Sequence, residues 1–176
     1  MIRIKHKFID HQIDPNTETL IIGTFNPDIE VNKAEFFYGR SKNYLWTLLP
    51  IALGDDNLKE KTKPEKIAFI KKHKIDFIDL ISEIKVQDNE KLNYTDTLID
   101  GKVIEWTKII EEISKLQHLK RIGFTRRTFA RVPNIQQKIE VIKQHAEQNG
   151  ILFQFLTTPA RFYNQQKQEE WSLFFK

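Results

Sequence analysis

Four short apolar runs recur along this chain of 176 residues, and segments with helical spacing separate them. Each run is bounded by polar residues or by turn chemistry. The runs are Thr19–Phe25, Asp76–Ile81, Arg121–Thr125 and Ile151–Thr157. Runs of this kind are typical of strands that are buried on both faces of a parallel sheet. The pattern therefore predicts a protein in which strands and helices alternate.

Helical patterns fill the intervals between these runs. The predicted helices comprise Asn43–Leu53, Pro64–His73, a stripe of Val103, Trp106, Ile110 and Ile113, a second stripe of Ile135, Ile139, Ile142 and Ala146, and Gln166–Phe175. Pro64 suits a first helical turn, and Asn149-Gly150 suits a helix end. The order predicts one domain over residues 1–176, an α/β fold with three α/β/α layers. Its central sheet has about four mostly parallel strands joined by right-handed crossovers.

The composition excludes several kinds of functional site. The chain has no cysteine, which removes disulfides, thiol nucleophiles and cysteine-ligated iron–sulfur clusters. Its five histidines are scattered with no spacing that suggests a metal site, so a metal-free protein is favoured. No apolar run approaches the roughly 20 residues that span a bilayer. Residues 1–8 alternate apolar and basic side chains and indicate a strand or arm instead of a secretion signal, so we expect a cytoplasmic protein.

Polar side chains follow the ends of the predicted strands. Asn26, Asp79, Arg126 and Thr158 all stand at or just after such an end. Ligands of doubly wound folds bind beyond the carboxyl ends of the strands, so these four side chains are expected to share one cleft. The net charge is only +4, which permits contact with nucleic acid without requiring it. For Arg126, with Arg127 and Arg131 nearby, a phosphate-facing role and a solvated surface are equally good interpretations.

An aromatic and basic loop follows the first strand. Three consecutive aromatics, Phe36 to Tyr38, precede Gly39, and they are too crowded for all three to face the core. Arg40 and Lys42 flank them. Aromatic faces, cations and a polar amide are what a pocket needs to hold a flat base beside a phosphate backbone. Asn43 either caps the next helix or points its amide into the cleft.

A rigid turn follows the last strand. Pro159 stiffens it, and Arg161 and Phe162 extend beyond it. A cation and an apolar wedge on such a turn can enter a base stack and hold the gap open. The alternative is that Phe162 packs on the C-terminal helix near Trp171.

Together these segments resemble the uracil-DNA glycosylase superfamily. Gly23–Pro27 is similar to its strand followed by a G-x-N-P or G-x-D-P turn, and Thr157–Arg161 to its Ser/Thr-Pro loop. Tyr38–Trp46 resembles the aromatic loop and N-x-F-W helix of the mismatch-specific uracil/thymine and hypoxanthine-DNA glycosylase branches. Ile75–Ile81 resembles a family strand, with Ile78 where Trp is usual. The resemblance spans the chain from about Leu20 to Trp171.

The resemblance implies a monofunctional DNA glycosylase of base-excision repair. Such a hydrolase cleaves the bond between deoxyribose and a deaminated base, uracil or hypoxanthine, after flipping the base out of the DNA. The leaving base creates an oxocarbenium-like sugar, which fixed dipoles and the phosphates of the substrate stabilise without a metal or cofactor. The implied partner is DNA, duplex or single-stranded, and the expected state is a monomer.

Motif matching implies a role for each candidate residue. Asn26 would position the attacking water, Phe25 and Tyr38 would contact the flipped base, and Asp79 would read a base edge. The residues implied to bind DNA are Arg40, Lys42, Arg126, Thr158, Pro159, Arg161 and Phe162.

This sequence departs from the family pattern at the first turn. Two residues separate Gly23 from Asn26, where one is usual. Either Asn26 keeps the family role, or the turn resembles the hypoxanthine branch, which lacks this Asn, and Asn43 is the better catalytic candidate. Asp28 is a further candidate to activate water or else a solvated turn residue. The last motif lacks the His of several branches.

Two other functions stay open at this point. One is a glycosylase-fold protein that binds nucleic acid without cleaving it. The other is a hydrolase or transferase of free nucleosides or nucleotides, which predicts a closed pocket without a basic rim.

Overall fold

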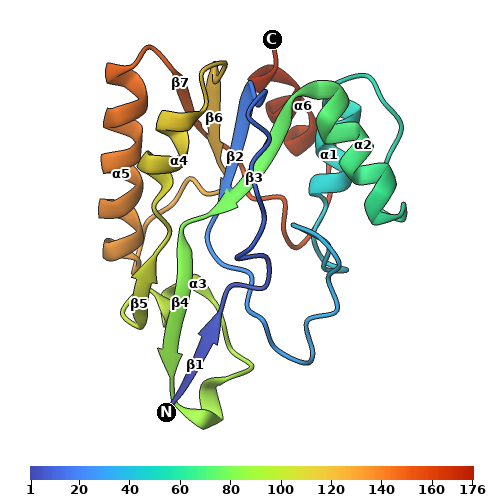
Figure 1. Cartoon of the computed structure of the whole chain (residues 1–176). Helices are drawn as coiled ribbons and strands as arrows, with labels where there is room; N and C mark the ends of the chain where they lie inside the picture. The colour runs from blue at the N-terminus through green and yellow to red at the C-terminus, as the bar shows by residue number, and fades with distance from the viewer.

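A parallel sheet of four strands lies at the centre of the computed structural model, which describes all residues 1–176 (Figure 1). Its strand order is β3 (Ile75–Asp79), β2 (Thr19–Gly23), β6 (Arg121–Phe124) and β7 (Leu152–Phe155). Every neighbouring pair runs parallel. The predicted parallel sheet is therefore confirmed, and the register sets Gly23 of β2 opposite Asp79 of β3.

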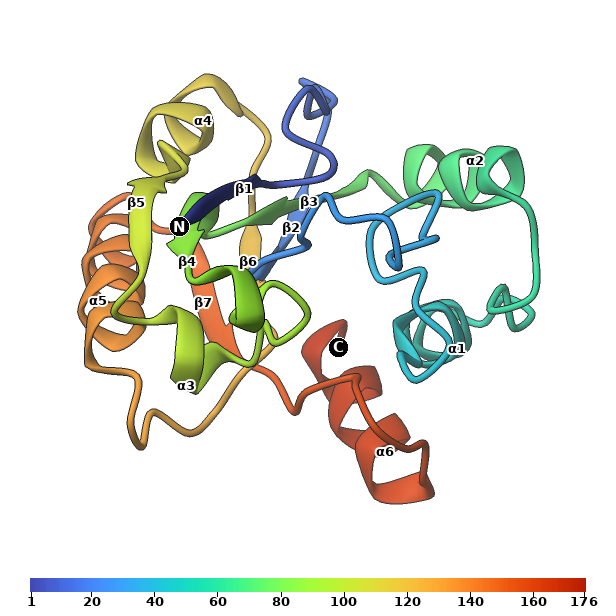
Figure 2. The ribbon, with the colours of Figure 1, turned by 90° about the horizontal axis from the view of Figure 1, so that it is seen from below.

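Helices cover both faces of this sheet. Helices α1 (Leu45–Ala52), α2 (Lys63–His73) and α6 (Gln165–Phe174) lie on one side, and α4 (Ile109–Lys115) and α5 (Pro133–Gln148) on the other (Figure 2). All five residues of β2 are buried. Leu20 and Ile22 belong to one hydrophobic core and Ile21 to the other, as alternation along a strand requires. The predicted α/β/α layering is confirmed.

The predicted helix ends are also confirmed. Pro64 lies in the first turn of α2, as predicted, and Thr62 and Glu65 add a capping box there. Helix α5 ends with Asn149 as its C-cap, and Gly150 follows at φ +70°, a conformation that favours glycine. The apolar stripe of α5 is buried along its whole length.

The prediction of one helix through Val103, Trp106, Ile110 and Ile113 is wrong in its first half. Val103–Trp106 forms strand β5, and α4 begins only at Ile109. Val, Ile and Trp are good strand formers, and β5 gains an antiparallel partner in β4 (Ile81–Val86). The three/four spacing arose because a strand and a helix both place apolar residues toward the same core.

The run Asp76–Ile81, predicted as a single strand, is divided at Leu80. Strand β3 ends at Asp79, and β4 continues into a second, antiparallel sheet of order β1 (Ile2–Lys5), β4, β5. The backbone N–H groups of Leu80 and Ile81 donate to Gly23 O and Thr24 O. They hold the chain at the point where it passes from one sheet to the other. Apolar side chains on both sides of the break hide it from the sequence.

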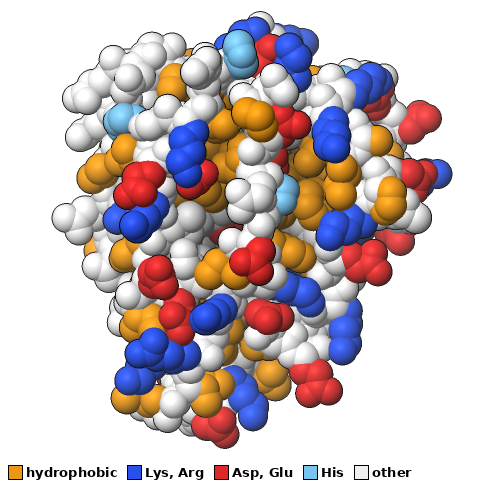
Figure 3. Space-filling view, viewed as in Figure 1, with side chains coloured by type: hydrophobic (Ala, Val, Ile, Leu, Met, Phe, Trp, Pro, Cys, Tyr) orange, Lys and Arg blue, Asp and Glu red, His pale blue; other side chains and the backbone are white.

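The N-terminal arm crosses the carboxyl ends of the parallel strands. His6 N donates to Ser82 O, Lys7 N donates to Asn26 O, and His6 forms an isolated bridge with Pro27. Two short helical elements, a 3-10 turn at Asp88–Glu90 and α3 (Asp96–Ile99), border the same end. Nowhere does a helix reach the length and hydrophobicity needed to cross a bilayer. On the face in Figure 3, Lys and Arg alternate with Asp and Glu, and no one charge covers it.

Candidate active site

A cleft of about 1290 Å³ opens where the parallel strands end. Its walls come from the loops after β2, β3, β6 and β7 and from the segment that leads into α3. Twelve of the residues that the sequence nominated line it: Phe25, Asn26, Tyr38, Arg40, Lys42, Asn43, Asp79, Arg126, Thr158, Pro159, Arg161 and Phe162. Asp28 does not line it and is exposed.

Gly23, the last residue of β2, lets the Asp79 carboxylate and the Tyr38 hydroxyl come close to the backbone. A Cβ atom at this position would lie 2.3 Å from Asp79 Oδ1 and 2.7 Å from the Tyr38 hydroxyl. Both distances are too short for any side chain, so only glycine leaves room for both groups.

Of the three consecutive aromatics, Phe36 and Phe37 are buried and Tyr38 lines the cleft. Tyr38 adopts φ +56° and packs edge-on against Phe77, with ring centroids 5.5 Å apart. Its hydroxyl is buried and has no hydrogen-bond partner. Burial raises the pKa of the Tyr38 hydroxyl well above its ordinary value, and the Asp79 charge adds to this effect. Tyr38 therefore keeps its proton and offers an unused donor.

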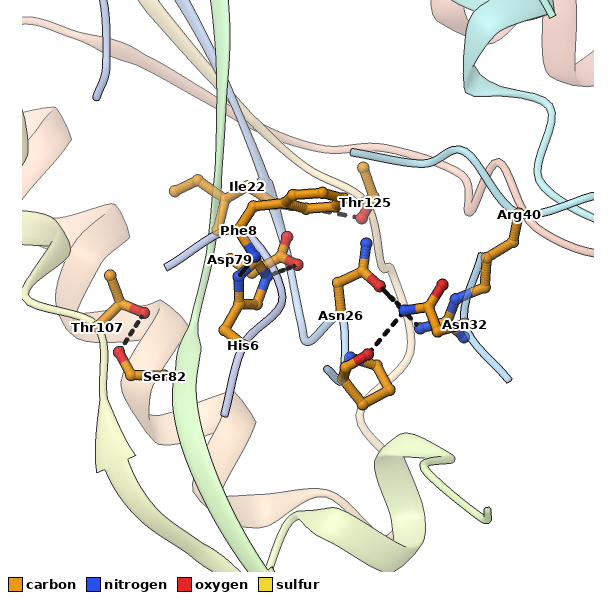
Figure 4. A network of polar contacts seen from close by, with 11 residues as sticks. His6, Phe8, Ile22, Asn26, Asn32, Arg40, Asp79, Ser82, Thr107 and Thr125 are labelled. Carbon is orange, nitrogen blue, oxygen red and sulfur yellow. Dashed lines mark hydrogen bonds and ion pairs between the residues drawn. The ribbon is translucent and has the colours of Figure 1, made fainter. Parts of the chain in front are cut away.

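Asp79 is held by a histidine from the N-terminal arm (Figure 4). His6 Nε2 lies 2.7 Å from Asp79 Oδ2, and the two side chains are only 6% and 8% exposed. The backbone N–H of Phe8 donates to His6 Nδ1 over 3.0 Å, so Nδ1 carries no proton and Nε2 donates to the carboxylate. Asp79 Oδ1 makes no hydrogen bond within the chain and stays free to accept one.

Asn26 is oriented by two donors. Asn32 Nδ2 lies 2.5 Å and Arg40 Nη2 3.4 Å from Asn26 Oδ1. The Ala34 N–H donates to Asn32 Oδ1, which fixes the orientation of that second amide in turn. The acceptor lone pairs of Asn26 are thereby used, and its Nδ2, without a partner in the chain, points away from Asn32 (Figure 4). Asn26 presents a donor to the cleft.

Asn43 differs from Asn26 in what it leaves free. Its Oδ1 accepts one hydrogen bond, from Leu45 N at 3.0 Å, in a turn just before α1, whose N-cap residue is Tyr44. A carbonyl oxygen has two lone pairs, so one acceptor position remains. The side chain is half-buried and also lines the cleft. Of the two sequence alternatives for Asn43, the helix cap is wrong by one residue, because Tyr44 is the N-cap, and the position at the cleft agrees with the structure.

The turn after β7 is braced from behind by a buried lysine. Lys167 Nζ donates to Ala160 O and Phe162 O, each at 3.0 Å, and lies 4.0 Å from the centroid of the Phe162 ring. Burial lowers the pKa of the Lys167 ammonium. Arg161 has φ +78°, and its N–H donates to Lys42 O, which ties this turn to the aromatic loop. Phe162 remains 53% exposed, and Pro159 is buried.

Two cationic side chains are partly engaged within the cleft wall. The Arg40 guanidinium lies 4.3 Å from the centroid of the Tyr94 ring, and burial lowers its pKa. Arg126 pairs with Asp96 at 2.5 Å, and Thr24 Oγ1 donates to the same carboxylate oxygen. Burial raises the pKa of Asp96, with Arg126 opposing the shift. Of the candidate phosphate ligands, Lys42 and Arg161 are the more exposed.

Sequence reasoning missed the residues that hold the nominated ones in place. These are His6, Asn32, Tyr94, Asp96 and Lys167. His6 and Asp79 are 73 positions apart, and no spacing rule connects them. Only the placement of residues 1–8 as a strand or arm gave a signal, and it did not say where the arm packs.

Charge in the cleft is mixed but predominantly positive. Six cationic side chains line it, against three acidic ones: Arg40, Lys42, Arg126, Arg127, Arg161 and Lys167, against Asp79, Asp96 and Glu170. No group of three or more His, Asp or Glu side chains is arranged to hold a metal ion. The cleft therefore offers an anionic ligand a cationic rim.

Comparison with known proteins gives one relative and one structural neighbour. No protein-family model matches the sequence. A Methanosarcina barkeri protein named hypoxanthine DNA glycosylase is 30% identical over 102 residues, which are 58% of this chain and 60% of that protein. The matched segment thus spans less than two thirds of that relative.

The structural neighbour shares the fold over nearly the whole chain. It is the solution structure of a provisionally assigned uracil DNA glycosylase from Methanosarcina acetivorans, with a TM-score of 0.67 and 21% identity. The match covers 98% of this chain and 96% of the other. The structural match shows a shared fold, and the sequence match shows a local similarity to a protein named hypoxanthine DNA glycosylase.

Proposed function

We propose that this protein is a monofunctional DNA glycosylase that removes a deaminated base, hypoxanthine or uracil, from DNA. The observation that carries the proposal is the pairing of a free acceptor with free donors in one cleft. Asp79 Oδ1 is the acceptor and Asn26 Nδ2 is the accessible donor, while the Tyr38 hydroxyl is a further donor that is buried beside Gly23. The hypoxanthine glycosylase similarity puts hypoxanthine first among the lesions to test.

Deamination changes the base edge that such a pair would read. In cytosine and adenine the ring nitrogen of the pairing edge is an acceptor beside an amino group. In uracil and hypoxanthine the same nitrogen carries a hydrogen and stands beside a carbonyl oxygen. A fixed carboxylate oxygen attracts that N–H and repels a lone pair, and an amide N–H₂ donates to the carbonyl. Asp79 and Asn26 therefore suit the deaminated edge.

Asn43 is the better candidate to position the attacking water. A water that attacks the sugar needs an acceptor for one of its hydrogens. Asn26 Oδ1 already accepts from two groups, whereas Asn43 Oδ1 accepts from one and is held rigidly by the first turn of α1. We therefore assign water positioning to Asn43 and base reading to Asn26.

The remaining contribution comes from the environment of the leaving base. Donors aimed at a carbonyl of the base stabilise the negative charge that it acquires as the glycosidic bond breaks. Asn26 Nδ2 and the Tyr38 hydroxyl are the groups available for this, and the raised pKa of Tyr38 keeps its hydrogen in place. Phe25, which also lines the cleft, would contact the flat face of the base.

A polymer suits the rim better than a free nucleoside does. Lys42 and Arg161 are exposed beside the opening, and Phe162 stands on the braced turn between the cleft and solvent. Cations that border an open cleft bind backbone phosphates on either side of a flipped nucleotide, and an exposed aromatic fills the gap in the stack.

The test is base excision followed by cleavage of the abasic site. The protein is incubated with oligonucleotides that carry hypoxanthine, uracil or xanthine, in single and double strands, and the products are treated with alkali. Strand scission at the lesion is the expected result. If no lesion gives scission while binding stays salt-sensitive, the enzymatic proposal fails and the non-catalytic binder takes its place.

A further inference from the structure

We propose that His6 is a positioning residue that fixes the oxygen with which Asp79 distinguishes a deaminated base from a normal one. This inference rests on the proposed function and deepens it. It gives the N-terminal arm, which carries none of the residues nominated from the motifs, a part in base selectivity.

The geometry holds His6 at two points. Its Nδ1 accepts the Phe8 N–H over 3.0 Å, and its Nε2 donates to Asp79 Oδ2 over 2.7 Å. Both contacts are made by nitrogens of one rigid ring, so this ring connects the backbone of the arm to the carboxylate. The imidazole also packs against Phe25 and Phe37, with ring centroids 6.0 and 5.7 Å away. Little freedom of rotation is left to either partner.

The consequence for Asp79 concerns which atom faces the base. A carboxylate has two equivalent oxygens and rotates freely when nothing holds it. With Oδ2 engaged by His6, Oδ1 is the oxygen that stays unpaired, beside the space that Gly23 leaves open. A fixed acceptor discriminates an N–H from a lone pair far better than a rotating one, because a buried mismatch leaves the polar group unpaired.

His6 and Asp79 both line a second cavity, which is separate from the cleft. Behind Asp79 lies a smaller cavity of about 170 Å³, lined by His6, Ser82, Thr107 and Glu112 among others. Asp79 lines both this cavity and the cleft, whereas His6 lines only the smaller one. Ser82 Oγ and Thr107 Oγ1 already pair with each other at 3.0 Å (Figure 4). Without the imidazole, the Asp79 carboxylate is free to turn toward this space.

A second histidine, just after the arm, provides a control. His11 Nε2 lies 2.6 Å from Asp76 Oδ1, a second partly buried His–Asp contact, and neither residue lines the cleft. His11→Ala therefore removes the same kind of contact nearby; His11 also lines the smaller cavity, but its partner is Asp76 and the contact between His6 and Asp79 stays intact. His6→Gln is the conservative variant, because its side-chain N–H₂ reaches about as far as Nε2 and can still donate to Asp79.

The experiment measures binding to oligonucleotides whose target nucleotide has a 2′-fluoro-arabino sugar, which resists cleavage. The ratio of affinities for hypoxanthine and adenine is determined for the wild type, His6→Ala, His6→Gln and His11→Ala, with uracil and cytosine as a second pair. We expect His6→Ala to lower this ratio by about tenfold or more. His6→Gln and His11→Ala should stay near the wild-type ratio.

The possible outcomes separate the inference from the function on which it rests. If the wild type shows no preference for either deaminated base, the proposed function fails, and this inference with it. If the wild type has the preference and folded His6→Ala keeps it within twofold, or His6→Gln loses it as fully as His6→Ala, only the role of His6 is overturned.

The tautomer of His6 gives a readout that does not depend on DNA. A long-range ¹H–¹⁵N NMR spectrum of the free protein should show the Nε2–H form, and Asp79→Asn should shift the Nε2 resonance. A proton on Nδ1 instead would contradict the contacts with Phe8 and Asp79 and overturn the inference.

Discussion

The floor and the rim of the cleft are built in different ways. On the floor, Asp79 and Asn26 are buried, and each has one atom held by a neighbouring side chain and another left free. On the rim, Arg161 and Phe162 are exposed, and mainly backbone contacts and Lys167 hold their turn. The floor thus fixes individual atoms, while the rim fixes the path of the chain.

This difference separates two kinds of recognition. A base edge is read by single hydrogen bonds, which demand atoms fixed in place. A phosphate backbone is read by charge, which tolerates movement. Substitutions on the floor are therefore expected to change the chemical step and the choice of base, and those on the rim to change affinity and its dependence on salt.

The largest effect is expected at Asn43. Asn43→Ala should lower the rate of base excision by about 10²-fold or more, since it removes the proposed acceptor for the attacking water. Single-turnover kinetics with saturating protein measures this rate. Asn43→Ser is the control for folding, because a serine hydroxyl can also accept the Leu45 N–H but lacks the amide. Equal rates for Asn43→Ala and the wild type, together with a 10²-fold loss in Asn26→Ala, would reverse the two assignments.

Asp79→Asn should come next, and its effect is on the choice of base. An amide in place of the carboxylate can present a donor to the ring nitrogen of adenine or cytosine, so discrimination against these bases should fall by about tenfold or more. Competition between hypoxanthine- and adenine-containing oligonucleotides measures it. A variant that loses all binding equally would show that Asp79 supports the cleft and does not select the base.

Gly23→Ala tests the close approach on the floor. The new Cβ would lie 2.3 Å from Asp79 Oδ1, so the carboxylate must move, and we expect a loss of about 1–3 kcal/mol in stability. Excision should fall with it. Gly101→Ala is the matched control, because nothing lies within 4 Å of its Cβ position. Similar melting temperatures and rates for the two variants would contradict the packing described here.

On the rim, Arg161→Ala should weaken DNA binding without changing the chemical step. The slope of log affinity against log salt should fall by about one, as expected for the loss of one phosphate contact. Lys115→Ala, on α4, removes a cation that does not line the cleft and should leave the slope unchanged. A slope that Arg161→Ala does not alter would remove this residue from the DNA interface.

The smallest effect concerns Tyr38 at alkaline pH. Its pKa in the folded protein is raised, so its contribution to stability is fully present below the ordinary tyrosine value of 10 and is lost as the pH rises above it. Until the protein unfolds, wild type and Tyr38→Phe should therefore form the same number of tyrosinates by ultraviolet absorbance. One additional tyrosinate in the folded wild type would show that the hydroxyl is hydrated.

The sequence predicted the parallel sheet and the members of the cleft well, for a physical reason. Apolar runs such as Leu20–Ile22 record burial on both faces, and polar residues after them mark strand ends that share one edge. Both signals are local. Each can be recognised from residues that are close together in the sequence.

What the sequence could not show depends on contacts between distant segments. The change of sheet at Leu80 is hidden because its flanking residues are apolar on both sides. The partner of Asp79 is His6, 73 positions away in the N-terminal arm. The orientation of Asn26 depends on Asn32 and Arg40. Which atom of an amide or carboxylate is free becomes visible only when its partners are placed.

The most direct test of the account compares excision of hypoxanthine and uracil by the wild type and Asn43→Ala, with alkaline cleavage as the readout. The account predicts strand scission at the deaminated base with the wild type and a loss of about 10²-fold in rate with the variant. No scission by the wild type at any deaminated base, with the protein folded and bound to DNA, would contradict it.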